Sequence, residues 1–410
     1  PARDKTFFIN LPTISGEPIP SALRLWFLRA CFPAARHRLL REGMHMTQAA
    51  AAAFLMLVLL FGGPWVTVQS TGAPEPQPAR TAQEQTDAPG ADESSVLRVW
   101  NGTETVEMTM AAYLPGVVRG EMPATFEEEA LKAQAVCART YAYRQIKANA
   151  YSRYGAHVDD STNYQVYNNT ESSERTNLAV KETDGKIVYY NDTPAETYYF
   201  STSCGYSTDG TIWGASKDEV PYLKGIGLTE KKKIPDLTDN DTFLKFIQGQ
   251  GEQNYDSSFP MYRWKTTITN KKLQQKVDTI GEIQGIFVTS RGTGGIAQTV
   301  QIVGSEGTKT LKGQSQIRSV LGSESLVYKK NDGTELTGWS TLPSAFFSVD
   351  ETARDEEKDI RTFTIWGGGY GHGVGMSQNG AQEMAREGKN YEEILMFFYD
   401  GVEIRDCEED

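Results

Sequence analysis

Cysteine is scarce in this sequence, with four residues in a chain of 410. No two of them are spaced as Cys-x-x-Cys, which excludes a zinc ribbon and a thioredoxin-type redox motif. Four cysteines in so long a chain also do not make the dense disulfide framework of a small secreted domain. The spacing leaves open one bridge at most, among Cys137, Cys204 and Cys407.

Acidic side chains outnumber basic ones outside the N-terminal segment. Residues 1–48 contain seven basic and three acidic side chains, which gives them a charge of +4 and leaves −16 on the rest of a chain whose total is −12. Binding to nucleic acid depends on clustered lysine and arginine side chains that neutralise phosphates. We therefore expect no nucleic-acid partner for the main body of the protein.

Charged side chains are absent from residues 43–74, and within this run residues 49–68 read AAAAAFLMLVLLFGGPWVTV. About twenty apolar residues cross a hydrocarbon core, so we predict a transmembrane signal anchor at 49–68. The basic residues before it predict a single pass through the cell membrane, with the following domain outside the cytoplasm. A cleaved signal peptide is the alternative. Residues 1–48 are then either cytoplasmic or mostly upstream of a true translation start at Met44 or Met46.

Large apolar side chains are absent from residues 69–94, which are rich in Pro, Ala, Gln and Thr. Such a segment buries too little apolar surface to offset the entropy lost on ordering, so we predict a disordered linker. The remaining residues, 95–405, are numerous enough for a full hydrophobic core. They form the predicted globular domain.

The globular domain mixes strand and helix patterns without the regular alternation of a doubly wound fold. We therefore predict an α+β fold with mostly antiparallel strands. Thr125 followed by Glu128 is a capping box, which predicts a long helix over 127–151. Strand patterns at 186–190 and 195–200 flank Asn191-Asp192 and predict a hairpin. Residues 228–345 are predicted to form an inserted second α+β lobe.

A loop rich in glycine follows the strand predicted at residues 362–366, and residues 367–378 read GGGYGHGVGMSQ. Its glycines allow the backbone to turn tightly and to approach a ligand, and it ends at the start of a helix, where free amides bind oxygen atoms. The Gly-Lys-Ser/Thr of a phosphate-binding loop is missing. His372, between two glycines, favours ligand binding over a purely structural turn.

Residue types alone suggest three further candidates. Glu121 lies between Gly120 and Met122-Pro123, where a carboxylate either acts in catalysis or offsets the dipole of the following helix. Cys204 would form a cysteine-hydrolase pair with His372. His157, with two aspartates close behind it, is a weak pattern for metal ligation.

Three blocks of the globular domain then point to a family. The first reads YLPGVVRGEMP at 113–123 and continues as EALKAQAVCARTYA at 129–142, the second reads YFSTSCG at 199–205, and the third reads GYGHGVGMSQNGA at 369–381. In this order they resemble the stage II sporulation protein D / amidase-enhancer family. The resemblance covers residues 95–405.

The resemblance implies a lytic transglycosylase that cleaves the glycan strands of peptidoglycan. Glu121 would be its single acid/base, closing a 1,6-anhydro ring on the sugar without a cofactor. The resemblance also implies engulfment during sporulation, with a membrane-bound amidase (stage II sporulation protein P) and a membrane protein (stage II sporulation protein M) as partners. We expect the glycan to be held by Tyr199, Ser201, Ser203, His372, Ser377 and Gln378. Gln134 and Arg139 are expected to support Glu121.

One stretch departs from the family pattern. Some members carry a histidine and two cysteines after the long helix as a metal-binding set, whereas here His157 is followed by Asp, Asn and Tyr where the cysteines would fall. We therefore expect no metal. Two other interpretations remain open: a non-catalytic peptidoglycan-binding module that stimulates an amidase, which would not need Glu121, and a cysteine hydrolase, which would need Cys204.

Overall fold

A computed structural model describes residues 90–160, 165–167, 173–249 and 252–408. The predicted anchor at 49–68, the segment 1–48 and the linker as far as residue 89 lie outside the described residues. None of the described helices combines the length and the apolar composition needed to cross a membrane. The last predicted linker residues form a short helix, α3 (Ala91–Ser94), so the predicted disorder does not extend to residue 94.

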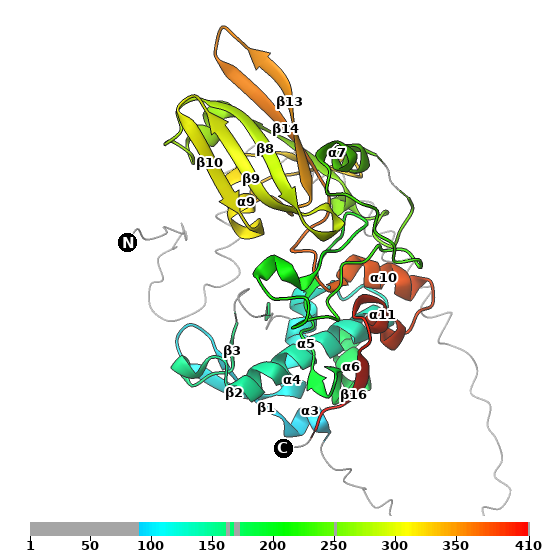
Figure 1. Cartoon of the computed structure of the whole chain (residues 1–410). Helices are drawn as coiled ribbons and strands as arrows, with labels where there is room; N and C mark the ends of the chain where they lie inside the picture. The colour runs from blue at the N-terminus through cyan, green and yellow to red at the C-terminus, as the bar shows by residue number, and fades with distance from the viewer. Residues whose placement is uncertain (1–89, 161–164, 168–172, 250–251, 409–410) are drawn as a thin grey trace, which may run out of the picture. The chain divides into compact units, whose positions relative to one another are not determined.

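The fold is α+β, as predicted, and most of its strand pairs are antiparallel. One hydrophobic core is built around the long helix α5 (Glu128–Ala148), against which four other helices pack. They are α4 (Met110–Glu121), α6 (Glu174–Glu182), α10 (Gln378–Arg386) and α11 (Tyr391–Phe398), and Figure 1 shows α4 beside α5. The α5 face that they cover carries small side chains, among them Ala135, Ala138 and Ala142, each without exposed surface. Small side chains allow this close packing of helices around α5.

Short strands border this helical core. β1 (Val96–Trp100) pairs antiparallel with β2 (Thr105–Thr109) and parallel with β3 (Val158–Asp159). β4 (Lys186–Tyr190) lies between β16 (Glu403–Asp406) and β5 (Thr193–Pro194), antiparallel to both. β6 (Tyr199–Phe200) pairs in parallel with β15 (Met376–Ser377), which brings together two of the three motif blocks.

A second core takes its buried residues from the range 264–365, while the predicted insertion spans 228–345. One antiparallel sheet holds β8 (Ile283–Arg291), β9 (Ala297–Gly304) and β10 (Gly307–Lys312), drawn in yellow tones in Figure 1. The other has the order β12-β11-β7-β14-β13. Its strands are β12 (Glu335–Leu336), β11 (Tyr328–Lys330), β7 (Trp264–Thr269), β14 (Ile360–Gly367) and β13 (Phe347–Asp355). Three helices accompany them: α7 (Asn240–Gln248), α8 (Asn270–Gln274) and α9 (Gln314–Leu321).

Two local predictions are wrong. The capping box at Thr125 does not form, because Glu127 is the N-cap of α5 and makes no side-chain cap; its N–H donates instead to Gln382 Oε1 at 2.6 Å. The turn at Asn191-Asp192 is present, with φ of 48° and 60°. However, the strand after it is only the short β5, since Tyr199–Phe200 pairs with β15 instead.

Candidate active site

Glu121 is the last residue of α4, and its carboxylate is partly buried. Its Oε1 accepts a hydrogen bond from the Val166 N–H at 2.8 Å. The side chains of Tyr199 and Gln378 also donate to this carboxylate. Burial raises the pKa of Glu121, and the three hydrogen bonds oppose that rise because they favour the charged form. The site therefore holds a carboxyl that gives up a proton less readily than an exposed glutamate, with donors in place for the anion.

Gly120 explains how the Val166 segment comes so close to Glu121. A Cβ atom at position 120 would lie 2.6 Å from the Val166 carbonyl oxygen, well inside van der Waals contact. Any larger residue would push the segment away and lengthen the hydrogen bond from the Val166 N–H. The Gly-Glu pair of the first motif block is thus required by the approach of a second backbone.

Tyr199 reaches Glu121 from β6, and Gln378 reaches it from the position directly after the paired strand β15. Tyr199 lies opposite Met376, and Gln378 is the first residue of α10, directly after the N-cap Ser377. Gln378 Nε2 also donates to Gln134 Oε1 at 3.2 Å, so the predicted support from Gln134 reaches Glu121 through Gln378.

The Tyr199 hydroxyl has two acceptors within reach. It lies 3.2 Å from Gln165 Oε1 and also donates to Glu121, and its single proton serves one of them at a time. Burial and the nearby Glu121 charge raise the pKa of Tyr199 well above its usual range, so the phenol keeps its proton and remains a donor.

His372 forms its hydrogen bonds with backbone groups next to these side chains. Its Nδ1 accepts from the Val374 N–H at 3.1 Å, and the ring also bonds to the Tyr199 backbone. The ring is surrounded by aromatic neighbours, with the Trp213 centroid at 5.0 Å and that of Phe200 at 5.8 Å. Burial lowers the pKa of His372 to about 4, so the ring is neutral near pH 7. His372 therefore holds the strand that carries Tyr199, and its ring nitrogens bond to backbone groups.

The three predicted serines fall into two groups. The Ser201 hydroxyl lies 3.3 Å from the Thr202 hydroxyl and is partly exposed. Ser203 and Ser377 are buried and turn towards Asp256, which accepts from the Ser203 N–H at 2.9 Å and from the Ser377 hydroxyl at 2.9 and 3.0 Å. Ser203 and Ser377 are thus occupied inside the protein.

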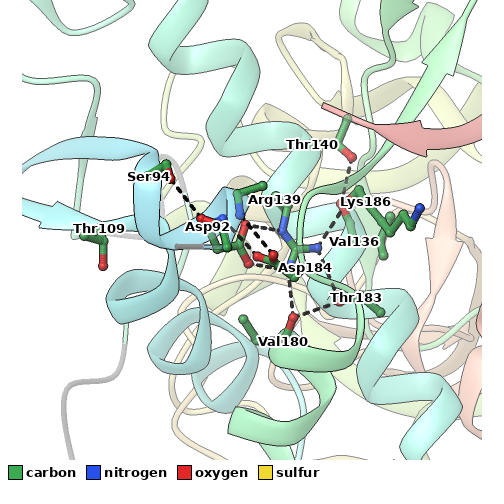
Figure 2. A network of polar contacts seen from close by, with 12 residues as sticks. Asp92, Ser94, Thr109, Val136, Arg139, Thr140, Val180, Thr183, Asp184 and Lys186 are labelled. Carbon is green, nitrogen blue, oxygen red and sulfur yellow. Dashed lines mark hydrogen bonds and ion pairs between the residues drawn. The ribbon is translucent and has the colours of Figure 1, made fainter. Parts of the chain in front are cut away.

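Arg139, predicted to support Glu121, belongs to a different network, which Figure 2 shows. Its guanidinium forms two bonds of 2.7 Å with the Asp92 carboxylate, and it also donates to the Lys186 and Val180 carbonyl oxygens, each at 3.1 Å. Asp184 accepts from the first amides of α3, next to Asp92. The ion pair between Arg139 and Asp92 therefore holds α3 against α5.

The remaining candidates do not combine into a reactive site. Cys204 has no exposed surface, and burial raises the pKa of its thiol to about 11, so little nucleophilic thiolate exists near pH 7. His157 Nδ1 accepts from the Arg98 N–H at 3.2 Å. Across the described ranges no three His, Cys, Asp or Glu side chains gather as a metal site. Cys137, Cys204 and Cys407 are all free thiols, so the bridge left open among them does not form.

Sequence reasoning missed three residues of the site. Val166 contributes only a backbone N–H, Gln165 lies in a segment without a clear secondary-structure pattern, and Asp256 is a single aspartate in a loop after α7. The three block motifs gave no signal for them. The sequence signal that could have indicated Val166 is Gly120, because a residue without a side chain lets a second backbone approach Glu121.

Comparisons with known proteins match the globular part of the chain. Residues 101–190 match the model of a family described as Stage II sporulation protein, and residues 208–375 match a family described as a domain of unknown function. The chain is 33% identical over 310 residues to stage II sporulation protein D of Bacillus subtilis (strain 168), covering 72% of this chain and 74% of that protein. It is also 33% identical over 312 residues to the Bacillus amyloliquefaciens protein of that name, with 72% and 74% covered. It is 29% identical over 307 residues to the amidase enhancer of Bacillus subtilis (strain 168), covering 71% of this chain and 40% of that protein.

Proposed function

Since this chain belongs to the stage II sporulation protein D family, we propose that it is a lytic transglycosylase that cleaves the glycan strands of peptidoglycan. Family membership supports a role in sporulation, at the cell wall. The observation that carries the finer proposal is the environment of Glu121: a carboxyl with a raised pKa, surrounded by three hydrogen-bond donors.

The proposed reaction uses Glu121 twice. In its protonated form, which burial favours, it donates a proton to the glycosidic oxygen as the bond from that oxygen to the sugar C1 breaks. The resulting carboxylate is stabilised by the donors from Val166, Tyr199 and Gln378. It then takes the proton of the C6 hydroxyl of the same sugar while the C6 oxygen bonds to C1. The ring closes without water, and Glu121 regains its proton.

A single carboxyl suits this reaction better than hydrolysis. Glycoside hydrolases use a pair of carboxyl groups, one as acid and the other as base or nucleophile. Among the described residues, the groups that shift the pKa of Glu121 are a backbone amide, a phenol and a side-chain amide, with no second carboxylate. A reaction whose nucleophile is the substrate's own hydroxyl needs no second carboxylate.

The test is a digest of peptidoglycan, both intact and treated with an amidase, with the products analysed by mass spectrometry. We expect the wild type to release fragments lighter than hydrolytic fragments by the mass of one water molecule. Glu121→Gln should release none, while the matched control Glu104→Gln, at an exposed position between β1 and β2, should behave as the wild type. Equal release by wild type and Glu121→Gln would refute the assignment.

The similarity to an amidase enhancer supports a second candidate, a module that binds peptidoglycan and stimulates an amidase. This activity would be independent of Glu121. Adding wild type or Glu121→Gln to an amidase and measuring the stem peptides released separates the two functions. Equal stimulation by both proteins, without anhydro products from either, would favour the binding module.

We also propose that residues 49–68 anchor the protein in the cell membrane and that the domain works outside the cytoplasm beside a membrane-bound amidase. The apolar run and the basic residues before it support this proposal. Fractionation of cells that express the full chain, followed by protease treatment of spheroplasts, tests it. Recovery in the soluble fraction, or protection of the domain from protease, would contradict it.

A further inference from the structure

Asp256 is a fully buried acidic residue, with 0% of its surface exposed, in a loop that the proposed chemistry does not use. It follows α7 in the chain, in the range matched by the domain of unknown function. A buried carboxylate is costly to ionise unless it is paired with a cation or well hydrogen-bonded. The contacts of Asp256 therefore bear on why an acid is present there.

The hydrogen bonds to the Asp256 carboxylate come from two serines, Ser203 and Ser377. The Ser203 N–H and hydroxyl donate to the carboxylate, and so does the Ser377 hydroxyl. The nearby Glu383 carboxylate adds to the cost of charging Asp256. Burial raises the pKa of Asp256 to about 6. Its charge thus costs stability at neutral pH, and a role other than stability is the better explanation for it.

The serines that Asp256 holds belong to the second and third motif blocks. Ser203 follows β6, the strand of Tyr199, and Ser377 is the last residue of β15. The Ser377 oxygen accepts the Gly380 N–H at 3.2 Å and thereby caps α10, while its proton goes to Asp256. Gln378, the next residue, donates to Glu121. Asp256 therefore orients the hydroxyl that sets the first turn of the helix carrying a donor to the reactive carboxyl.

We propose that Asp256 is a positioning residue for Glu121, acting through Ser377 to hold Gln378 within hydrogen-bonding distance of the Glu121 carboxylate. The inference rests on the proposed function only in treating Glu121 as the reacting group. Without Asp256, the Ser377 hydroxyl has no fixed direction for its proton, and the start of α10 is free to rotate. Gln378 then loses its alignment with Glu121.

The consequence is measurable at Glu121 itself. Because the Gln378 hydrogen bond favours the carboxylate, losing it raises the pKa of Glu121. We expect a rise of roughly one pKa unit, which corresponds to about 1.4 kcal/mol, the order of one hydrogen bond to a charged group. The other titratable groups facing Glu121 are the phenols of Tyr113 and Tyr199, and the pKa of each lies above its ordinary value. Neither phenol loses its proton in the range where Glu121 does.

The experiment is a carbon-13 NMR titration of the full chain labelled at glutamate, with the Glu121 signal identified by its absence in Glu121→Gln. We expect Asp256→Ala and Gln378→Ala to raise the pKa of Glu121 by similar amounts, and the double variant to raise it no further. The exposed control Asp218→Ala should leave the pKa unchanged. A folded Asp256→Ala with an unchanged Glu121 pKa, or shifts that add fully in the double variant, would overturn the proposal.

Two additions keep the result decisive. Ser377→Ala removes the hydroxyl that both donates to Asp256 and caps α10, so it should raise the pKa of Glu121 at least as far as Asp256→Ala does. An unchanged Glu121 pKa in Ser377→Ala would overturn the proposal even where Asp256→Ala fails to fold. In the glycan-cleavage assay, Asp256→Ala should lower kcat more than it changes KM and should move the pH profile upward with the Glu121 pKa. If the wild type cleaves no glycan, the proposed function fails, but the NMR titration still decides the role of Asp256.

Discussion

Removing the Asp92 carboxylate should destabilise the protein strongly. Asp92 and Arg139 are 4% and 1% exposed and are joined by two bonds of 2.7 Å. In Asp92→Ala the guanidinium stays buried with only neutral partners, two carbonyl oxygens and the Thr183 hydroxyl at 3.3 Å. Breaking a buried ion pair from one side costs about 3–5 kcal/mol, because one charge is left uncompensated.

Urea unfolding of the wild type and of Asp92→Ala measures this loss. The midpoint should fall while the dependence on urea concentration stays the same. Asp400→Ala is the matched control, because its ion pair with Lys224 is exposed and should contribute nothing measurable.

A double variant gives a second arm to the measurement. Replacing both partners, as in Asp92→Leu with Arg139→Met, should restore much of the stability, because no unpaired charge remains. A loss below about 1 kcal/mol in Asp92→Ala would show that the pair behaves as a surface pair and would refute the reasoning.

Four further predictions follow from the same structure. Tyr199→Phe should lower the rate of glycan cleavage about tenfold, because a lost hydrogen bond to a charged group is worth about 1.4 kcal/mol. It should also move the pH profile of the rate upward, and an unchanged profile would argue against the bond to Glu121. The folded-state pKa of Glu121 is raised, so ionising this carboxyl costs folding free energy as pH rises. Glu121→Gln should therefore be more stable than the wild type at neutral pH but not below about pH 4, and equal unfolding free energies at neutral pH would contradict this. Thiol reagents should leave activity intact because Cys204 is buried, and rapid inactivation would revive the cysteine-hydrolase interpretation. Gly375→Ala should lower the melting temperature far more than Gly388→Ala. Both glycines have positive φ, 75° and 89°, but a Cβ at 375 would lie 2.0 Å from a carbonyl oxygen, whereas the space around 388 is open. Similar losses of melting temperature in the two variants would contradict the clash.

Local sequence signals predicted much of the secondary structure. The strand at 186–190 has its predicted bounds, and the helix predicted over 127–151 forms as Glu128–Ala148. These elements depend on side chains a few residues apart, which a sequence displays directly. Thr125 failed as a cap because the Glu127 amide finds its partner in Gln382, 255 residues away.

The site was predicted in part, for a related reason. Glu121, Tyr199 and Gln378 lie in the motif blocks, and the structure brings them together. Arg139 lies in a block too, but its partner Asp92 precedes the domain boundary set from the sequence. Asp256 reaches Ser377 across 121 residues, and Val166 uses its backbone, so neither leaves a pattern in the sequence.

The central claim is that Glu121 drives ring closure without water. The most direct test is a digest of peptidoglycan in water enriched in the heavy oxygen isotope, followed by mass spectrometry of the new glycan ends. We predict unlabelled anhydro ends with the wild type and no new ends with Glu121→Gln. Heavy oxygen at the new ends, or ends that form equally well without the Glu121 carboxyl, would contradict the claim.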